Sequence, residues 1–430
     1  MKNLKPYFET GSFQNLLSGL NPIKTVIQYL SLVLIFLVIL SGCVSKNNEI
    51  ATIEVRNTAS VDIPDAIIRI ADTGILDKIN STSGTSINVR SDTIHPMQLI
   101  REKDTIIELL FLCELKANEG KFFTISKTDQ QVNFKRRTQA EISIKKGGEW
   151  QGRLYQGGLF ENIEFLRVPD EHTDHSSYIR YEGPGWESDL VGYRFYLDWR
   201  NAIDIFGKKV DTMVLQNVGQ DEFDSYHEMS DWGVDILNVG ESLGMGSIGY
   251  WHENKAERVA VTDSIFCEIS YSGILESKIK TTYFGWQISD YRTDLISRLS
   301  IQAGSRLTMH QLEISSEMDN LCTGIVKHPD AELIQPESPT GEWIWFASWG
   351  RQTLQDDLSG MAVIYRQDDL IKLAEDELNH VVVLNPSDNT LTYYFLAAWE
   401  LEPGGIRSKE EFVAYLNEQA EILNHEPIVK

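Results

Sequence analysis

Two segments of the chain concentrate side chains that can bind anions or transfer protons. The first spans residues 171–209 and reads EHTDHSSYIRYEGPGWESDLVGYRFYLDWRNAIDIFGKK. A guanidinium binds a carboxylate through two parallel hydrogen bonds, and aromatic rings stack against the apolar faces of sugars. This composition suits a sugar-binding site, although similar aromatic clusters also occur in ordinary β-cores. Its candidate ligand-binding residues are Arg180, Arg194, Arg200, Trp186 and Glu187, and Tyr181 is a candidate catalytic residue.

The second segment spans residues 226–252 and reads YHEMSDWGVDILNVGESLGMGSIGYWH. Histidine titrates near neutral pH, so His227 is the leading candidate for a general acid or base, with a hydrogen-bonded structural role as the alternative. Tyr226 is a second candidate, because a nearby cation can lower the pKa of a tyrosine. In a strand these neighbours would point to opposite faces, so we expect only one of them to serve the site. Trp232 is a candidate ligand-binding residue, whereas the glycines after it are typical of turns.

The residues VGYRFYLDWRN, if they form a strand, separate polar from apolar side chains. Alternate residues of a strand point to the same face. One face would carry Arg194, Tyr196, Asp198 and Arg200, and the other Tyr193, Phe195, Leu197 and Trp199. This pattern is expected for a strand that lines a cleft and equally for one with a solvated face.

The motif EHTDH offers Glu171, His172, Asp174 and His175 as possible metal ligands. None of the dense ligand motifs of zinc or EF-hand calcium sites is present, so we expect a solvated loop and no cofactor, with a divalent cation such as calcium left open. The chain also has no nucleophile elbow, phosphate-binding glycine loop or dinucleotide fingerprint, which excludes those enzyme classes.

Short segments rich in β-branched and aromatic residues, from ATIEVRN to TYYFLAAWE, must position these groups. They predict an all-β protein built as a large antiparallel β-sandwich, with a mutarotase-like supersandwich as a finer expectation. A helix is expected at the C-terminus, where Ser408 and Glu411 form a capping box ahead of an apolar stripe that reaches residue 423. A weaker helix is expected over residues 371–378.

The domain organisation leaves two possibilities open. The polar stretch KTDQQVNFKRRTQ predicts a boundary between an N-terminal β layer, residues 51–145, and a main β body, residues 146–430, that includes the C-terminal helix. One continuous domain over residues 51–430 is the alternative.

The N-terminus predicts export. Lysines precede the apolar run VIQYLSLVLIFLVILSGC, and small residues stand directly before Cys43, as in the lipobox of bacterial lipoproteins. We expect a signal peptide over residues 1–42, lipidation of Cys43, a tether over residues 43–50 and a place on the outer membrane, facing the periplasm or the cell surface. A transmembrane anchor is the alternative, because the run is nearly long enough to span a bilayer.

The net charge of the chain limits the kinds of partner that it can bind. The chain carries a net charge of −24, which argues against nucleic acid as a partner, because phosphate binding needs a cationic surface. An anionic ligand therefore needs local arginine or lysine. The remaining cysteines, Cys113, Cys267 and Cys322, are too few for a disulfide scaffold, and buried free thiols are expected, with one disulfide as the alternative.

The segment YEGPGWESDLVGYRFYLDWRNAIDIFGKK, followed by YHEMSDWGVDILNVGESLGMGSIGYW, resembles a secreted family, domain of unknown function family 4861. Its members are mostly encoded in bacterial polysaccharide-utilisation clusters. One member, from the degradation of the sulfated algal polysaccharide ulvan, is an oligosaccharide dehydratase that acts on a non-reducing-end glucuronate or iduronate. The resemblance implies that this chain removes water from such a uronate to give a 4,5-unsaturated product.

That reaction requires a cation or strong donors on the carboxylate, a base for the C5 proton and an acid for the departing 4-hydroxyl. The candidate residues above include all three kinds of group. Two other functions remain open. A glycan-binding lipoprotein would need no proton-transfer group, and a glycoside hydrolase would use a carboxylate pair such as Glu187 and Asp231.

Overall fold

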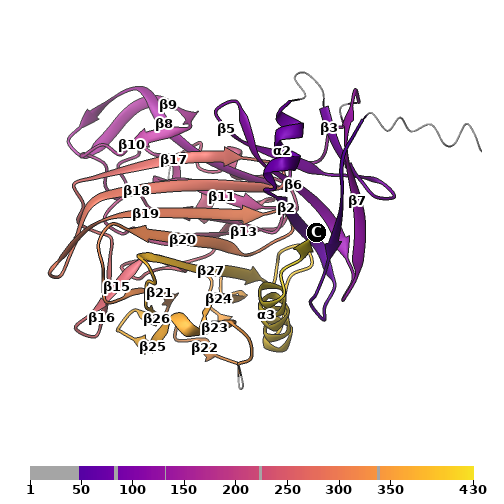
Figure 1. Ribbon diagram of the computed structural model, residues 1–430. Coiled ribbons are helices and arrows are strands. Elements are labelled where there is room, and N and C mark those ends of the chain that lie inside the picture. Colours follow the sequence, from indigo (N-terminus) through magenta and orange to yellow (C-terminus); the bar gives the residue numbers. More distant parts are fainter. Residues whose placement is uncertain (1–47, 82–85, 131, 222–224, 337–338) are drawn as a thin grey trace, which may run out of the picture. The chain divides into compact units, whose positions relative to one another are not determined.

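Antiparallel strands make up most of the computed structural model (Figure 1), which describes residues 48–81, 86–130, 132–221, 225–336 and 339–430. The expected signal peptide and Cys43 lie outside these residues. Ile50–Lys430 form one compact unit. Within the described residues, no helix is long and apolar enough to cross a membrane.

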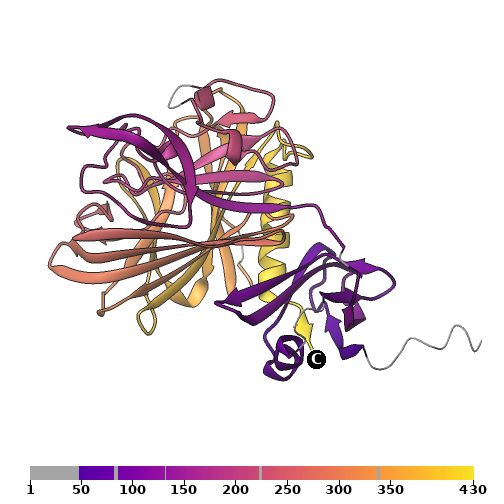
Figure 2. The same ribbon diagram turned by 90° about the horizontal axis from the view of Figure 1, so that it is seen from above.

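Two large sheets carry the main core. The nine-stranded sheet has the order β10 (Phe165–Arg167), β17 (Ser264–Ser272), β18 (Glu276–Ile288), β19 (Tyr291–Gln302), β20 (Thr308–Ile314), β27 (Thr390–Trp399), β24 (Leu358–Arg366), β23 (Trp343–Arg351) and β22 (Ala331–Ile334). The six-stranded sheet has the order β14 (Gly233–Asp235), β13 (Ile203–Lys208), β12 (Val191–Phe195), β11 (Gly185–Ser188), β8 (Thr138–Gln151) and β9 (Leu154–Ile163). Figure 2 shows the magenta strands of the six-stranded sheet facing the orange strands of the nine-stranded sheet.

Aromatic side chains join the two sheets. Trp186 of β11 and Tyr193 of β12 pack on Phe395 of β27, with ring centroids 6.5 and 5.6 Å apart. Trp186 is 1% exposed and Tyr193 is fully buried. Burying each large apolar side chain contributes about 1.5–3 kcal/mol, so this interface fixes the position of β11 and β12, which lead to the polar segments. The prediction of a mostly-β protein of packed antiparallel sheets is confirmed, and the supersandwich stays a prediction.

Three smaller sheets complete the described part of the chain. The first contains β28 (Ile428–Val429), β1 (Glu49–Arg56), β7 (Gly120–Thr128), β3 (Ser86–Arg90) and β4 (Ile94–His95). The second contains β2 (Ile63–Ile70), β6 (Thr105–Leu115) and β5 (Met97–Glu102). The third contains β16 (Lys255–Arg258), β15 (Gly249–His252), β21 (Leu321–Val326), β26 (Asn379–Leu384) and β25 (Leu370–Glu375). The expected buried free thiols are confirmed at Cys113, Cys267 and Cys322.

The C-terminal helix is confirmed as α3 (Lys409–Asn424). The Ser408 hydroxyl accepts a hydrogen bond from the Glu411 amide at 3.2 Å, while the Glu411 carboxylate accepts one from the Arg407 amide at 2.8 Å. Phe412 packs on Trp349 of β23, with ring centroids 5.3 Å apart, which anchors the helix to the nine-stranded sheet.

The helix expected over residues 371–378 was wrong. These residues form β25 and the turn that follows it, because they pair with the valine-rich strand β26. The Asp376 carboxylate accepts hydrogen bonds from the Leu378 and Asn379 amides at 2.9 and 2.7 Å, which closes the turn. A short helix that the sequence did not predict, α2 (Thr73–Asn80), begins after Asp72, whose carboxylate accepts from the Ile75 amide at 2.9 Å. Short helical segments also occur at Arg180–Glu182, Leu215–Asn217, Ser225–His227 and Gln367–Asp369.

Ser408→Ala should lower the free energy of unfolding by about 1 kcal/mol, because the substitution removes the N-terminal cap of α3. Urea denaturation of purified protein measures this change. Ser408→Asp keeps a capping oxygen and should restore most of the loss. Equal losses in both variants would contradict the capping role.

His310 of β20 should make stability depend on pH. Its ring is buried, with Nε2 2.8 Å from the Ser297 hydroxyl and Nδ1 3.3 Å from the Gly246 carbonyl, and burial lowers its pKa from 6.5 to about 3. The unfolded chain binds the proton more readily, so the stabilising contribution is complete above pH 6.5 and is lost as pH falls towards 3.

In His310→Gln, the free energy of unfolding should fall less steeply between pH 7 and pH 4 than in the wild type. Urea denaturation across this range measures both slopes. Identical slopes would contradict this role of His310 and would show that another group causes the loss of stability at low pH.

Candidate functional site

The strand that carries Arg194 ends earlier than the sequence predicts. β12 stops at Phe195, and residues 196–201 turn back into β13. The Asp198 carboxylate accepts a hydrogen bond from the Arg200 amide at 2.9 Å, which stabilises the turn. The strand alternation that would place Arg194 and Arg200 on one face therefore does not extend beyond β12. The polar side chains of the turn nevertheless lie beside Arg194, because the turn folds back towards it.

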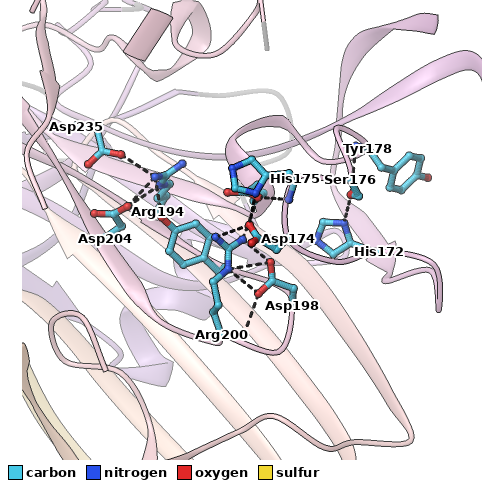
Figure 3. A network of polar contacts seen from close by, with 12 residues as sticks. His172, Asp174, His175, Ser176, Tyr178, Arg194, Asp198, Arg200, Asp204 and Asp235 are labelled. Carbon is cyan, nitrogen blue, oxygen red and sulfur yellow. Dashed lines mark hydrogen bonds and ion pairs between the residues drawn. The ribbon is translucent and has the colours of Figure 1, made fainter. Parts of the chain in front are cut away.

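Arg194 is the centre of a buried polar network (Figure 3), and its guanidinium is surrounded by acceptors. It donates to Asp204 Oδ2 at 2.7 Å, to Asp235 Oδ2 at 2.7 Å, to the Tyr196 hydroxyl at 2.7 Å and to the Tyr226 hydroxyl at 3.0 Å. Asp204 lies opposite Arg194 in the β12–β13 ladder, and Asp235 ends the neighbouring strand β14. Three adjacent strands thus supply one cation and two carboxylates.

Burial and the nearby Asp204 carboxylate raise the pKa of Asp235 well above its usual value. Two carboxylates around one guanidinium leave one negative charge to be balanced in a buried position. The imidazole of His227 lies beside this charge, with Nδ1 3.4 Å from Asp235 Oδ2, and its side chain is 31% exposed. A proton held by Asp235 or by His227 balances the charge, so this pair is suited to exchanging a proton with a ligand.

Tyr226 and His227 lie in the helical turn Ser225–His227 and not in a strand. The condition for opposite faces, a strand, is therefore not met, and about three residues per turn leave neighbouring side chains on adjacent faces. Their ring centroids are 4.5 Å apart. Burial raises the pKa of Tyr226 to about 12 despite the opposing effect of Arg194, so its hydroxyl stays protonated near neutral pH.

Arg200 is the centre of a second polar group beside the first (Figure 3). Its guanidinium contacts Asp198 at 2.5 Å and both Asp174 and Glu182 at 2.9 Å. His175 Nδ1 lies 2.6 Å from Asp174 Oδ1, and the His175 side chain is 52% exposed. Although burial opposes the shift, Arg200 and Arg194 lower the pKa of Glu182, whereas burial raises the pKa of Asp174.

The ring of Tyr196 joins the two groups. It lies 4.7 Å from the guanidinium carbon of Arg194 and 3.8 Å from that of Arg200. Both cations therefore share one aromatic ring, which favours them electrostatically. The result is a continuous network with one histidine–carboxylate pair in each half, His227 with Asp235 and His175 with Asp174.

Arg180 and Tyr181 form a separate buried contact. The Arg180 guanidinium pairs with the Glu141 carboxylate of β8, and the Tyr181 hydroxyl donates to the same carboxylate at 2.7 Å. Arg180 is 1% exposed and Tyr181 is 4% exposed. Gly183, which follows them, has no space for a side chain, because a Cβ would lie 1.7 Å from the Phe195 carbonyl oxygen. These contacts hold the entry to β11 against β12.

Trp186 and Glu187 lie in the interior. The Trp186 indole donates to the Thr308 hydroxyl at 2.9 Å, and the Glu187 carboxylate pairs with Lys208 at 2.5 Å. Glu187 also accepts hydrogen bonds from the Val214 and Leu215 amides at 2.8 and 2.9 Å and is fully buried. A ligand would reach either side chain only if the core opened.

The remaining candidates lie at different depths. Trp232 is partly buried and packs on Phe206, with ring centroids 5.9 Å apart. Asp231, the suggested hydrolase partner of Glu187, is exposed. A surface carboxylate and a fully buried one do not make the pair that glycoside hydrolysis requires.

Three residues of the second group could offer ligands to a metal ion. Ligand atoms of Asp174, His175 and Glu182 lie within 4.8 Å of one another. The Arg200 guanidinium, however, already contacts Asp174 and Glu182 and supplies positive charge at this position. The donor set would suit a hard divalent cation only if Arg200 moved away. As the site is built, the cation beside these carboxylates is the Arg200 guanidinium.

Sequence reasoning missed several residues of the network or gave them too little weight. Asp204 and Asp235 lie inside the two segments but carry no local signal, because their role depends on strands β12, β13 and β14 lying side by side. His175 belongs to a histidine–carboxylate pair, although its motif predicted a solvated loop. Arg258 of β16 also escaped notice, because a single arginine in the segment KAER has no distinguishing pattern.

These features define a mostly-β protein with a buried arginine–carboxylate network beneath two partly exposed histidines. Residues 55–429 match the family described as Domain of unknown function (DUF4861), and the chain belongs to that family. Among curated protein sequences, none matches this chain.

Two solved structures from Enterococcus faecalis are similar to the chain at 8% sequence identity. One is a protein in glycosyl hydrolase family 38, with a TM-score of 0.40, of which the similarity covers 48%, together with 90% of this chain. The other is an alpha-mannosidase, with a TM-score of 0.41, of which the similarity covers 46%, together with 89% of this chain. The chain thus spans just under half the length of either structure.

Lys208→Met should lower the free energy of unfolding by about 3–5 kcal/mol, because it leaves the Glu187 carboxylate buried without its cation. Chemical denaturation measures the loss. The double variant Lys208→Met with Glu187→Gln removes the charge as well and should be clearly more stable than the single variant. If both variants unfold alike, the charge of Glu187 is not the cause.

Proposed function

We propose that this protein is an oligosaccharide dehydratase that removes water across C4 and C5 of a uronate at the non-reducing end. The substrates are glucuronate- or iduronate-terminated fragments of ulvan-type polysaccharides, and the product carries a 4,5-unsaturated uronate. One observation carries the proposal: two histidine–carboxylate pairs, His227 with Asp235 and His175 with Asp174, lie at the exposed edge of one buried network. The resemblance to a family that includes an oligosaccharide dehydratase also supports it.

In the proposed reaction His227 accepts the C5 proton. The electrons of the C5–H bond pass to the uronate carboxylate as an enolate, and then form the C4–C5 double bond as the C4–O bond breaks. His175 donates a proton to the departing hydroxyl, which leaves as water. A proton then passes from His227 back to His175 through solvent, so the net change is the loss of one water molecule.

The buried residues support this proton transfer. When His227 becomes positively charged, the negative charge that Arg194 leaves unbalanced on Asp204 and Asp235 stabilises it. Asp174 supports His175 in the same way, and Arg200 holds Asp174 in place. Tyr226, which stays protonated and buried, is in this proposal a positioning residue for Arg194.

We also propose that Cys43 carries a lipid and tethers the protein to the outer membrane, facing the periplasm or the cell surface. The partner is then an anionic oligosaccharide encountered outside the cytoplasm. Because the chain has a net charge of −24, binding of such a ligand depends on local cations. Added salt should weaken this binding little, since the salt also screens the negative potential of the whole protein.

His227→Asn should lower the rate of water loss by about 10²–10⁴-fold, because it removes the proton acceptor. The measurement follows the ultraviolet absorbance of the conjugated product and the mass of the oligosaccharide. His425→Asn is a matched control, since His425, directly after α3, lies 3.3 Å from Glu421 in a similar pair.

His175→Asn should lower product formation to a similar extent, but exchange of the C5 hydrogen with deuterated solvent should persist, because His227 is still present. Full activity of this variant would remove His175 from the mechanism. Cleavage of the chain in place of water loss would favour a glycoside hydrolase. Binding without any change in mass would favour a glycan-binding protein.

A further inference from the structure

We infer that Arg258 and Trp199 form an anion-binding subsite, in which the guanidinium holds a carboxylate or sulfate group of a sugar that stacks on the indole. The inference rests on the proposed function for the identity of the ligand as an acidic oligosaccharide. It also supplies a guanidinium that is not paired with a carboxylate of the protein. The three arginines expected from the sequence do not offer one, since Arg180, Arg194 and Arg200 are each paired in this way.

Arg258 has no such partner among the described residues. Its Nη1 atom is buried and makes no hydrogen bond, although the side chain as a whole is only partly buried. Burial lowers the pKa of Arg258, and the charges of Glu241 and Asp198 oppose that shift without forming an ion pair with it. A partly buried guanidinium with unused donors is favoured by an anion that supplies acceptors.

Asp198 cannot provide those acceptors as the site is built. Both of its oxygens accept hydrogen bonds from the Arg200 guanidinium, at 3.0 and 2.5 Å. Asp198 is also 5% exposed, which keeps it in the Arg200 group. Arg258 therefore lies next to the second half of the network but remains available to a ligand.

Trp199 lies directly beside Arg258. The guanidinium carbon is 5.1 Å from the centre of the indole ring. All ten tryptophans of the chain lie in its described part, and Trp199, 41% exposed, alone among them is exposed. An exposed indole next to a cation is the combination that a charged sugar requires, because its apolar face stacks on the ring while its anionic group reaches the guanidinium.

The surroundings of Arg258 also leave space for an extended ligand. With Lys255 and Gln287 it lines a pocket of 610 Å³. Glu241, Glu257 and Glu377 line the same pocket and can accept hydrogen bonds from sugar hydroxyls, but together with Asp376 they repel a second anion. The acidic group of the ligand is therefore expected at Arg258, and its neutral sugars along the pocket.

The test measures binding of a sulfated, uronate-terminated oligosaccharide by calorimetry, in the full mature chain carrying His227→Asn to prevent turnover. Adding Arg258→Gln should weaken binding by about 10-fold or more, since a charge-assisted hydrogen bond contributes on that scale. Arg258→Lys keeps the charge but loses the pair of parallel hydrogen bonds that a guanidinium makes, so its affinity should lie between those of the parent and Arg258→Gln. Trp199→Leu, a change at an exposed position, should also weaken binding several-fold.

Arg366→Gln is the matched control. Arg366 lies 5.1 Å from the ring of Trp343, as Arg258 does from Trp199, but it is paired with Glu342 at 3.1 Å, and Trp343 is 7% exposed. This control should bind like the parent. Thermal denaturation checks that each variant is folded, and if Arg258→Gln is not, Arg258→Lys and Trp199→Leu carry the test.

Two further probes identify the anion. A carboxyl-reduced oligosaccharide should lose its dependence on Arg258 if the guanidinium binds the uronate, and a desulfated one should lose it if the guanidinium binds sulfate. Dependence that survives both treatments would overturn the inference, as would equal binding by the Arg258 and Trp199 variants and the parent.

The outcome also separates this inference from the proposed function. Water loss by the wild type without any dependence on Arg258 would overturn the subsite alone. Binding that depends on Arg258 without water loss would overturn the dehydratase alone. If the parent binds no acidic oligosaccharide, both are wrong.

Discussion

The burial of Arg194 is the constraint on which the polar half of this structure depends. A guanidinium that is enclosed on all sides must be neutralised and hydrogen-bonded, or its desolvation would exceed what the fold can offset. Asp204 and Asp235 supply the charge, while Tyr196 and Tyr226 supply further acceptors. Satisfying this one side chain brings together β12, β13, β14 and the turn that contains His227.

Such a network contributes little to stability, because removing several charges from water costs about as much as their attraction returns. Its arrangement is more informative than its strength. The carboxylates outnumber the arginines in both halves, and in each half a partly exposed histidine lies beside an acid. The interior thus places buried carboxylates next to groups that can accept a proton. This arrangement suits acid–base chemistry, whereas in a purely structural core it would cost desolvation free energy without a return.

Several strong expectations from the sequence succeeded because they depend on local rules. Alternating polarity predicted the strands, and the capping residue with its apolar stripe predicted α3. Others failed where tertiary contacts outweighed local preference. Residues 371–378 pair with β26 and do not form a helix, and the proposed strand over residues 191–201 turns at Asp198. Trp186 and Glu187 were candidate ligand-binding residues, and their burial is a property of the packed sheets alone.

By itself the sequence determined the composition of the site and the kind of scaffold. Residue types and spacing pointed to residues 171–209 and 226–252, which supply the members of the arginine–carboxylate network, and strand patterns required packed antiparallel sheets. Only the tertiary structure decided which arginines are committed to the protein's own carboxylates, which histidines reach the surface, and that Arg258 lies beside Trp199. The reason is physical: charge pairing and burial depend on distances between strands that are far apart in the chain, and no local pattern records them.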